Sequence, residues 1–138
     1  MFRRVKAAVP AGLYYGLIFF LSAQPNVELP VSFPLIDKIL HLFLYAGFGV
    51  CVTYSLIRLS RIKAWRQLLV LVLLGIVLGG LDEVHQMFVP GRSADVADAI
   101  ADILGILAGW GMVRAWIRWP SGRRIFLGSA SEPKDDQP

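Results

Sequence analysis

The amino-acid sequence predicts an all-α integral membrane protein, built as a bundle of about four transmembrane helices. Hydrophobic residues make up 56% of the 138 residues and charged residues only 17%, whereas a soluble domain carries about 25% charged residues. The hydrophobic residues also gather in four long runs separated by short polar stretches, as membrane-spanning helices do. The net charge is +4, but no soluble basic domain remains outside the runs, which excludes a nucleic-acid-binding module.

The first run covers residues 7–23 and follows three basic residues within the first six positions. A secretory signal peptide is the alternative interpretation of this arrangement. Cleavage after Ala23 would put Leu21 at position −3, where a small side chain is required. We therefore predict that the run is retained as the first transmembrane helix.

The other three runs cover residues 35–57, 65–89 and 96–119. Each is long enough to cross about 30 Å of hydrocarbon as a helix that rises about 1.5 Å per residue. A proline-containing loop precedes the second run, a short basic loop precedes the third, and Pro90-Gly91 ends the third. Residues 1–119 are therefore expected to form one transmembrane domain, and the polar residues 120–138 a disordered cytoplasmic tail.

The distribution of basic residues predicts the orientation of the bundle. Twelve of the fourteen Lys and Arg residues fall at the two termini or in the loop between the second and third helices, and only Lys38 and Arg92 fall on the opposite side. Because Lys and Arg collect in cytoplasmic loops, both termini should be cytoplasmic and the loops at 24–34 and 90–95 should face outward.

Acidic residues lie deeper in the predicted helices than their charge favours. The third run is uncharged only over residues 67–81, about 22 Å of helix, so it must continue through Asp82 and Glu83 to span the hydrocarbon. The fourth run likewise includes Asp98 and Asp102. Ionisable groups at such depth normally face the bundle interior and mark a functional site.

The second helix carries polar residues along one face. Asp37, His41 and Tyr45 follow one another at four-residue steps, so they form a stripe that descends from the outer surface. Three helices therefore bring ionisable groups to a similar depth. From these residues we expect an inward-facing polar cluster.

Small residues at four-residue spacing predict where helices approach closely. The third helix has Gly75 and Gly79, and Glu83 continues the same face. Comparable stripes are Ala97, Ala101, Gly105 and Gly109 on the fourth helix, and Gly12 and Gly16 on the first. The same Gly/Ala faces are candidates for contacts in a homo-oligomer.

Most of these polar residues also have a structural interpretation. Asp95 and Asp98 are suited to capping the fourth helix, and Asp37 the second. The two histidines suit hydrogen-bonded packing, and Tyr45 suits packing or the aromatic belt. Lys38 and Arg92 suit contacts with lipid phosphates. The adjacent pair Asp82-Glu83 is the least well explained in this way, because it lies at the negative end of the helix dipole.

These segments resemble the VanZ-like family of membrane proteins. Asp37-Lys38-Ile39-Leu40-His41 with Tyr45 is similar to the family pattern DK-x-x-H-x-x-x-Y. The segment from Asp82 to Arg92 resembles the signature DE-x-x-Q-x-x-x-P-G-R, which Asp95, Asp98 and Gly105 continue. The chain departs from the pattern at Asp102, where the family often has Asn. The family's namesake is linked to resistance to the glycopeptide teicoplanin, so the resemblance implies a protein of the bacterial cytoplasmic membrane.

The leading hypothesis is an envelope-facing protein that binds or modifies an amphiphile, either a lipid-linked cell-wall precursor or a lipoglycopeptide antibiotic, with membrane lipids as further partners. Asp82, Glu83 and His41 are the candidate catalytic residues. The candidate ligand-binding residues are Asp37, Lys38, Tyr45, His85, Gln86, Arg92, Asp95, Asp98 and Asp102.

Two other functions stay open at this stage. One is an intramembrane hydrolase or transferase in which Asp82 or Glu83 acts with His41 or His85 as acid and base. The other is ion or proton transport along carboxylates. No HExxH motif or cysteine cluster is present, so neither a metal site nor a cofactor is predicted.

Overall fold

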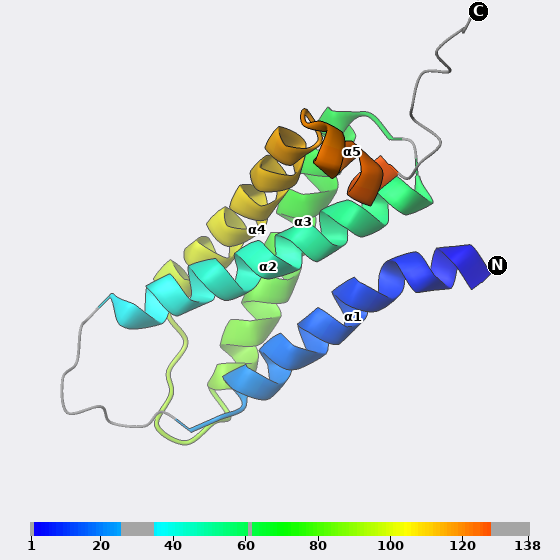
Figure 1. Cartoon of the computed structure of the whole chain (residues 1–138). Coiled ribbons are helices and arrows are strands. Elements are labelled where there is room, and N and C mark those ends of the chain that lie inside the picture. Colours follow the sequence, from blue (N-terminus) through cyan, green and yellow to red (C-terminus); the bar gives the residue numbers. More distant parts are fainter. Residues whose placement is uncertain (1, 26–34, 61, 128–138) are drawn as a thin grey trace, which may run out of the picture.

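The computed structural model describes residues 2–25, 35–60 and 62–127, with side chains described from residue 6 onward. Every regular element in this part of the chain is helical, which confirms the all-α prediction (Figure 1). The helices are α1 (Phe2–Ser22), α2 (Ile36–Leu59), α3 (Ala64–Gln86), α4 (Val96–Trp116) and α5 (Pro120–Leu127). The four long helices match the four predicted runs closely.

The four long helices run alternately up and down, so the start of α1, the α2–α3 connection and α5 share one end of the bundle (Figure 1). The α3–α4 connection lies at the opposite end. Helix α2 packs most extensively on α4, while α1 packs on α2 and α3 on α4. The central pair α2–α4 therefore links the other two helices.

Glycines allow the close approach of α2 and α4. A Cβ atom added at Gly105 would overlap the carbonyl oxygen of Leu42, and one added at Gly109 would overlap that of Ala46. Gly49 faces Ile106 of α4 in the same way. The small residues predicted on α4 thus lie at a helix interface, where backbone proximity and dispersion contacts replace the hydrophobic effect within lipid.

The small-residue stripe on α1 behaves differently from this expectation. Gly12 and Gly16 are exposed, and a Cβ atom at either position would meet no described atom within 4 Å. Helix α1 instead packs through Ile18, which is 1% exposed. It is also tied to α2 by the Ser55 hydroxyl, which donates a 2.8 Å hydrogen bond to the carbonyl of Ala7. Within the described chain, the α1 glycines mediate no helix contact.

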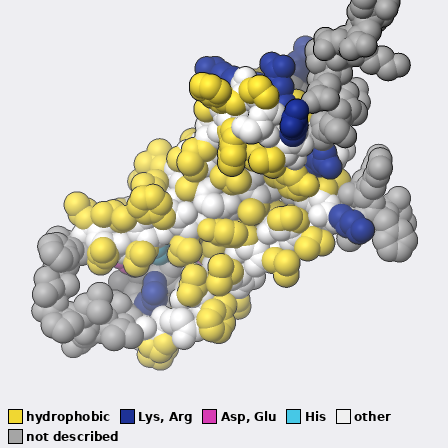
Figure 2. Space-filling view, in the orientation of Figure 1, with side chains coloured by type: hydrophobic (Ala, Val, Ile, Leu, Met, Phe, Trp, Pro, Cys, Tyr) yellow, Lys and Arg dark blue, Asp and Glu magenta, His cyan; other side chains and the backbone are white. Residues whose placement is uncertain are grey.

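The outer surface of the bundle is strongly apolar. Side chains such as Phe88, Phe43 and Leu13 are 80%, 69% and 71% exposed, and hydrophobic atoms cover most of the face in Figure 2. Among the described residues, α2, α3 and α4 are long and apolar enough to cross a membrane, and α1 contributes a shorter apolar stretch, Lys6–Ser22. The protein is therefore a multi-pass membrane protein.

The C-terminal segment differs from the expected disordered tail. Residues 120–127 form α5, which packs against α2 and α4. Its Phe126 is 4% exposed and lies edge-on to the rings of Tyr54 and Trp116. For these eight residues the prediction of disorder is wrong. Phe126 buries its ring against Tyr54 and Trp116, and this contact holds the segment on the bundle. Residues 26–34, 61 and 128–138, which include parts of the predicted loops and tail, lie outside the described residues.

Candidate functional site

The predicted polar residues gather at the end of the bundle where α3 ends and α2 and α4 begin. The connection from α3 to α4 turns at Gly91, whose φ of 77° suits glycine. A carboxylate oxygen of Glu83, Oε2, accepts a 2.6 Å hydrogen bond from the backbone N–H of Asp95. The Asp95 carboxylate in turn accepts from the N–H of Ala97 and caps α4. Glu83 and Asp95 therefore hold the end of α3 against the start of α4, and the capping interpretation of Asp95 is confirmed.

Lys38 joins α2 to the start of α4. Its Nζ lies 2.6 Å from Asp95 Oδ2 and 3.1 Å from Asp98 Oδ1. The Asp98 side chain is 3% exposed, so this lysine compensates a buried charge and is not a free surface cation. The hydrogen bond from Lys38, with that from the Ala97 N–H, holds the pKa of the Asp95 carboxyl below its usual range.

A buried pair lies beneath these charges. His41 Nδ1 is 2.9 Å from Asp102 Oδ1, and the two side chains are 7% and 0% exposed. Gly79 of α3 leaves room for Asp102, since a Cβ at Gly79 would lie 3.0 Å from Asp102 Oδ2. The α3 glycine stripe therefore accommodates a polar side chain of α4 within the bundle.

Gln86 connects the buried pair with the third helix and with the surface. Its Nε2 donates a 3.2 Å hydrogen bond to Asp82 Oδ2 and lies 3.5 Å from His41 Nε2. Its Oε1 accepts from Arg92 at 3.4 Å. Asp82 and Gln86 are 3% and 2% exposed. A continuous chain of contacts thus runs from partly buried Arg92 down to buried Asp102.

A hollow of about 170 Å³ opens above this chain of contacts. Arg92 lies at its rim, donates to the carbonyl of Gln24 at 3.1 Å and stands 4.0 Å from the exposed carboxylate of Asp37. Asp37 does not cap α2 as the sequence suggested, because the N-cap residue is Leu35 and no side chain caps it. The residues that line the hollow are Asp37, Lys38, Gln86, Gly91, Arg92, Ser93, Asp95 and Asp98.

A search against protein-family models matches the VanZ/LLP1 family over residues 7–118. The chain belongs to this family. The match covers α1 from residue 7 onward and all of α2, α3 and α4, so the polar network lies within the VanZ-like region of the chain. Neither the search of curated proteins nor that of solved structures gives a match.

The site unites most of the residues predicted for this VanZ-like chain, from three different helices. His85 is the main exception: its ring stacks on Phe19 of α1 at 4.3 Å between centroids, on the side of α3 that faces α1. Tyr45 extends the site inward, since its ring lies parallel to that of His41 at 6.5 Å, and its hydroxyl has no described partner. His41, rather than His85, is therefore the histidine of the polar cluster.

The buried part of the site contains ligand types that bind metal ions. His41, Asp82, Glu83 and Asp102 each offer a ligand atom, and these atoms lie within 4.8 Å of one another. Asp37, His41 and Asp98 form a second, more exposed grouping. The sequence alone predicted no metal site, because these four residues are spread over three helices and form no spaced motif. Sequence reasoning also did not predict that Gly79 would adjoin Asp102.

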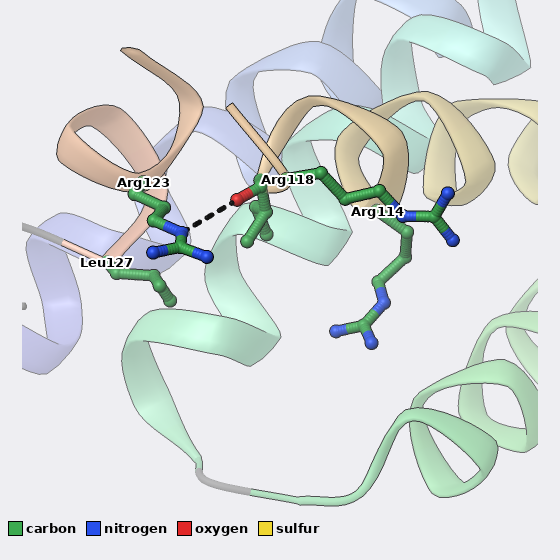
Figure 3. A pocket seen from close by; sticks show the side chains of 5 residues that line it. Arg114, Arg118, Arg123 and Leu127 are labelled. Atoms are coloured by element: carbon green, nitrogen blue, oxygen red, sulfur yellow. Dashed lines mark hydrogen bonds between the residues drawn. The ribbon is translucent and has the colours of Figure 1, made fainter. Parts of the chain in front are cut away.

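A second hollow, of about 390 Å³, lies at the opposite end of the bundle between α4 and α5 (Figure 3). It is lined by Arg114, Arg118 and Arg123 with Ile117 and Leu127. Arg123 donates a 3.4 Å hydrogen bond to the carbonyl of Ile117. Although larger, this hollow contains none of the predicted site residues, and none of the described residues that line it is a carboxylate.

Proposed function

We propose that this VanZ-like protein binds the polar headgroup of an amphiphile in the hollow between Lys38 and Arg92. The observation that carries the proposal is the position of the hollow: cations and carboxylates line it, and apolar surface adjoins it. Arg92 suits a phosphate or carboxylate, because its planar guanidinium donates two parallel hydrogen bonds. Asp37 and Ser93 suit hydroxyl or amide groups of a sugar or peptide.

The ligand's apolar tail has a place beside the hollow. Leu35, Val96 and Phe88 flank its elements and are 62%, 77% and 80% exposed. An acyl or polyprenyl chain can lie along these side chains while its headgroup enters the hollow. The substrate class we propose is therefore a lipid-linked cell-wall precursor or a lipoglycopeptide such as teicoplanin, with drug resistance as one consequence of binding.

Direct binding tests this proposal. The full-length protein in mild detergent is titrated with a polyprenyl diphosphate and, separately, with teicoplanin, and binding is followed by native mass spectrometry. We expect Arg92→Gln to weaken binding at least tenfold, whereas Arg118→Gln at the other end leaves it unchanged. Equal affinity of the wild type and both variants would contradict the proposal.

The proposed ligand requires the hollow to face the outside of a bacterial cytoplasmic membrane. A Cys51→Ser background carrying either Ser93→Cys or Ser121→Cys places one exposed thiol at each end of the bundle. In intact spheroplasts we expect a membrane-impermeant maleimide to label position 93 and not position 121. The reverse labelling pattern would place the hollow in the cytoplasm and exclude an envelope ligand.

Intramembrane catalysis is a second candidate function, favoured by the His41–Asp102 pair. A carboxylate at Nδ1 fixes the tautomer of a histidine, so that Nε2 of His41 can accept a proton from water or a hydroxyl in place of its 3.5 Å contact with the Gln86 amide. In that case His41→Gln should abolish turnover of the bound amphiphile and leave its affinity unchanged. If the wild type shows no turnover and His41→Gln lowers the affinity for the amphiphile, binding remains the function.

Ion transport has less support. Between Lys38 and Arg58 on α2, between Arg66 and Asp82 on α3, and between Asp102 and Arg114 on α4, the sequence contains no charged residue. A proton or ion that reached Asp102 would find no further charged residue along α2, α3 or α4 before the basic end, so a carboxylate relay through a single chain is incomplete.

A further inference from the structure

The carboxylates beneath the hollow carry more negative charge than the described cations neutralise. Lys38 is engaged by Asp95 and Asp98. The contacts of Asp82 and Glu83 are a side-chain amide and a backbone N–H, neither of which carries a charge. His41, which pairs with Asp102, is the one ionisable base in contact with these three carboxylates in the described chain. Residues 26–34, outside the described part, contain no Lys, Arg or His.

Two of these carboxylates are held by one oxygen and leave the other free. Glu83 is fixed through Oε2 by the Asp95 N–H, while its Oε1 is buried and has no described partner. Asp102 is fixed through Oδ1 by His41, while its Oδ2 is buried and likewise unpartnered. The two residues are 7% and 0% exposed. Buried polar atoms are normally satisfied, so two free oxygens in one cluster call for an unobserved partner.

We propose that His41, Asp82, Glu83 and Asp102 bind a divalent metal ion in the interior of the bundle. Their ligand atoms lie within 4.8 Å of one another, a spread that one ion can bridge. A doubly charged cation would offset the excess of carboxylates, and it would give the free oxygens a partner. One imidazole with several carboxylates suits Mn²⁺, Fe²⁺ or Zn²⁺ better than a thiolate-preferring ion.

The neighbouring contacts resemble the outer contacts that hold metal ligands in place. Ligating carboxylates and histidines are normally fixed through their second polar atom by another group. Here the Asp95 N–H holds Glu83, and Gln86 holds Asp82. Gln86 also lines the hollow, so the proposed ion lies one residue away from the headgroup site. The inference rests on the proposed function for the role of the ion, which is to attract an anionic headgroup.

Metal titration of the full-length protein tests the inference without any amphiphile. The protein in mild detergent is stripped with a chelator, reloaded with Mn²⁺, Zn²⁺ or Co²⁺ and measured by elemental mass spectrometry. We expect about one equivalent in the wild type and a rise in melting temperature on loading. Glu83→Gln and Asp82→Asn should each weaken metal binding at least tenfold. Arg118→Gln, which lies at the opposite end of the bundle and outside both groupings, should not.

The absorption spectrum of the Co²⁺-loaded wild type decides the matter even where a variant fails to fold. Ligand-field bands that show nitrogen and oxygen coordination support the site. Binding of less than a tenth of an equivalent, or equal binding by the wild type and both cluster variants, would overturn it. If the metal-free protein still binds polyprenyl diphosphate in an Arg92-dependent way, the proposed function stands and the metal inference fails. If the protein binds the metal but no amphiphile, the metal inference stands and the proposed function fails.

Discussion

The two ends of the bundle carry opposite charges and treat them in opposite ways. At the α3–α4 end, all six described carboxylates are engaged by cations, backbone N–H groups or an amide, and four of the six are at most 7% exposed. At the α5 end, Arg114 and Arg118 are exposed, and no carboxylate among the described residues pairs with them. Figure 2 shows Lys and Arg side chains gathered at this end, whereas almost no Asp or Glu atoms reach the visible surface.

This difference separates two roles of charge in a membrane protein. Water and lipid headgroups solvate an exposed guanidinium at little cost, so such residues can orient the chain without specific partners. A carboxylate within the bundle has no such solvent and depends on a defined neighbour. Substitutions should therefore be costly at the acidic end and tolerated at the basic end.

The largest expected effect is at the buried histidine. Replacing His41 by Ala leaves the Asp102 carboxylate without its described partner inside the bundle. Removing one member of a buried ionic pair typically costs about 3–5 kcal/mol, so we expect a strongly reduced free energy of unfolding. Unfolding in a graded series of SDS and mild-detergent mixtures measures this value. A loss below about 1 kcal/mol would mean that the pair contributes little to the difference between the ends.

A smaller effect is expected from Gly79→Ala. The new Cβ would lie 3.0 Å from Asp102 Oδ2 and 3.2 Å from Asp102 Cβ, and overpacking of this kind costs about 1–3 kcal/mol. Gly80→Ala is the matched control, since no described atom lies within 4 Å of its Cβ. There the better helix propensity of Ala should leave stability unchanged or raise it by up to about 1 kcal/mol. Equal effects at the two adjacent positions would contradict the close contact of α3 and α4.

The smallest effect is expected at the basic end. Arg118 is exposed, so Arg118→Ala should change the free energy of unfolding by less than about 0.5 kcal/mol in the same SDS titration. Its accumulation in membranes should equal that of the wild type. A loss of stability comparable with that of His41→Ala would show that the hollow between α4 and α5 is a packed structural element. The contrast between the two ends would then fail.

Much of the fold follows from local pattern. The apolar runs at 35–57 and 96–119 correspond to α2 (36–59) and α4 (96–116), because helix length in a membrane is set by the hydrocarbon thickness. Asp95 before the fourth run is a cap by residue type and position, and Gly91 after Pro90 is a turn. The depth of Asp82 and Glu83 also follows from the shortness of the uncharged segment before them.

Which residues contact one another across the helices could not be predicted from the sequence. His41 and His85 each follow a family-like motif, yet one meets Asp102 and the other stacks on Phe19. Gly12 and Gly16 have the same spacing as Gly105 and Gly109, yet only the α4 pair lies against a neighbouring backbone among the described residues. Spacing along one helix defines a face, but it does not say which helix covers that face.

The sequence by itself determined that this is a bundle of apolar helices with acidic residues at one end and basic residues at the other, because burial in lipid depends on composition and length within each segment. The tertiary structure decided that His41 pairs with Asp102, that Lys38 joins Asp95 to Asp98, and that α5 folds onto α2 and α4. The contacts of Lys38 and His41 join residues about 60 positions apart. They depend on the distance and rotation between packed helices, which no single segment encodes.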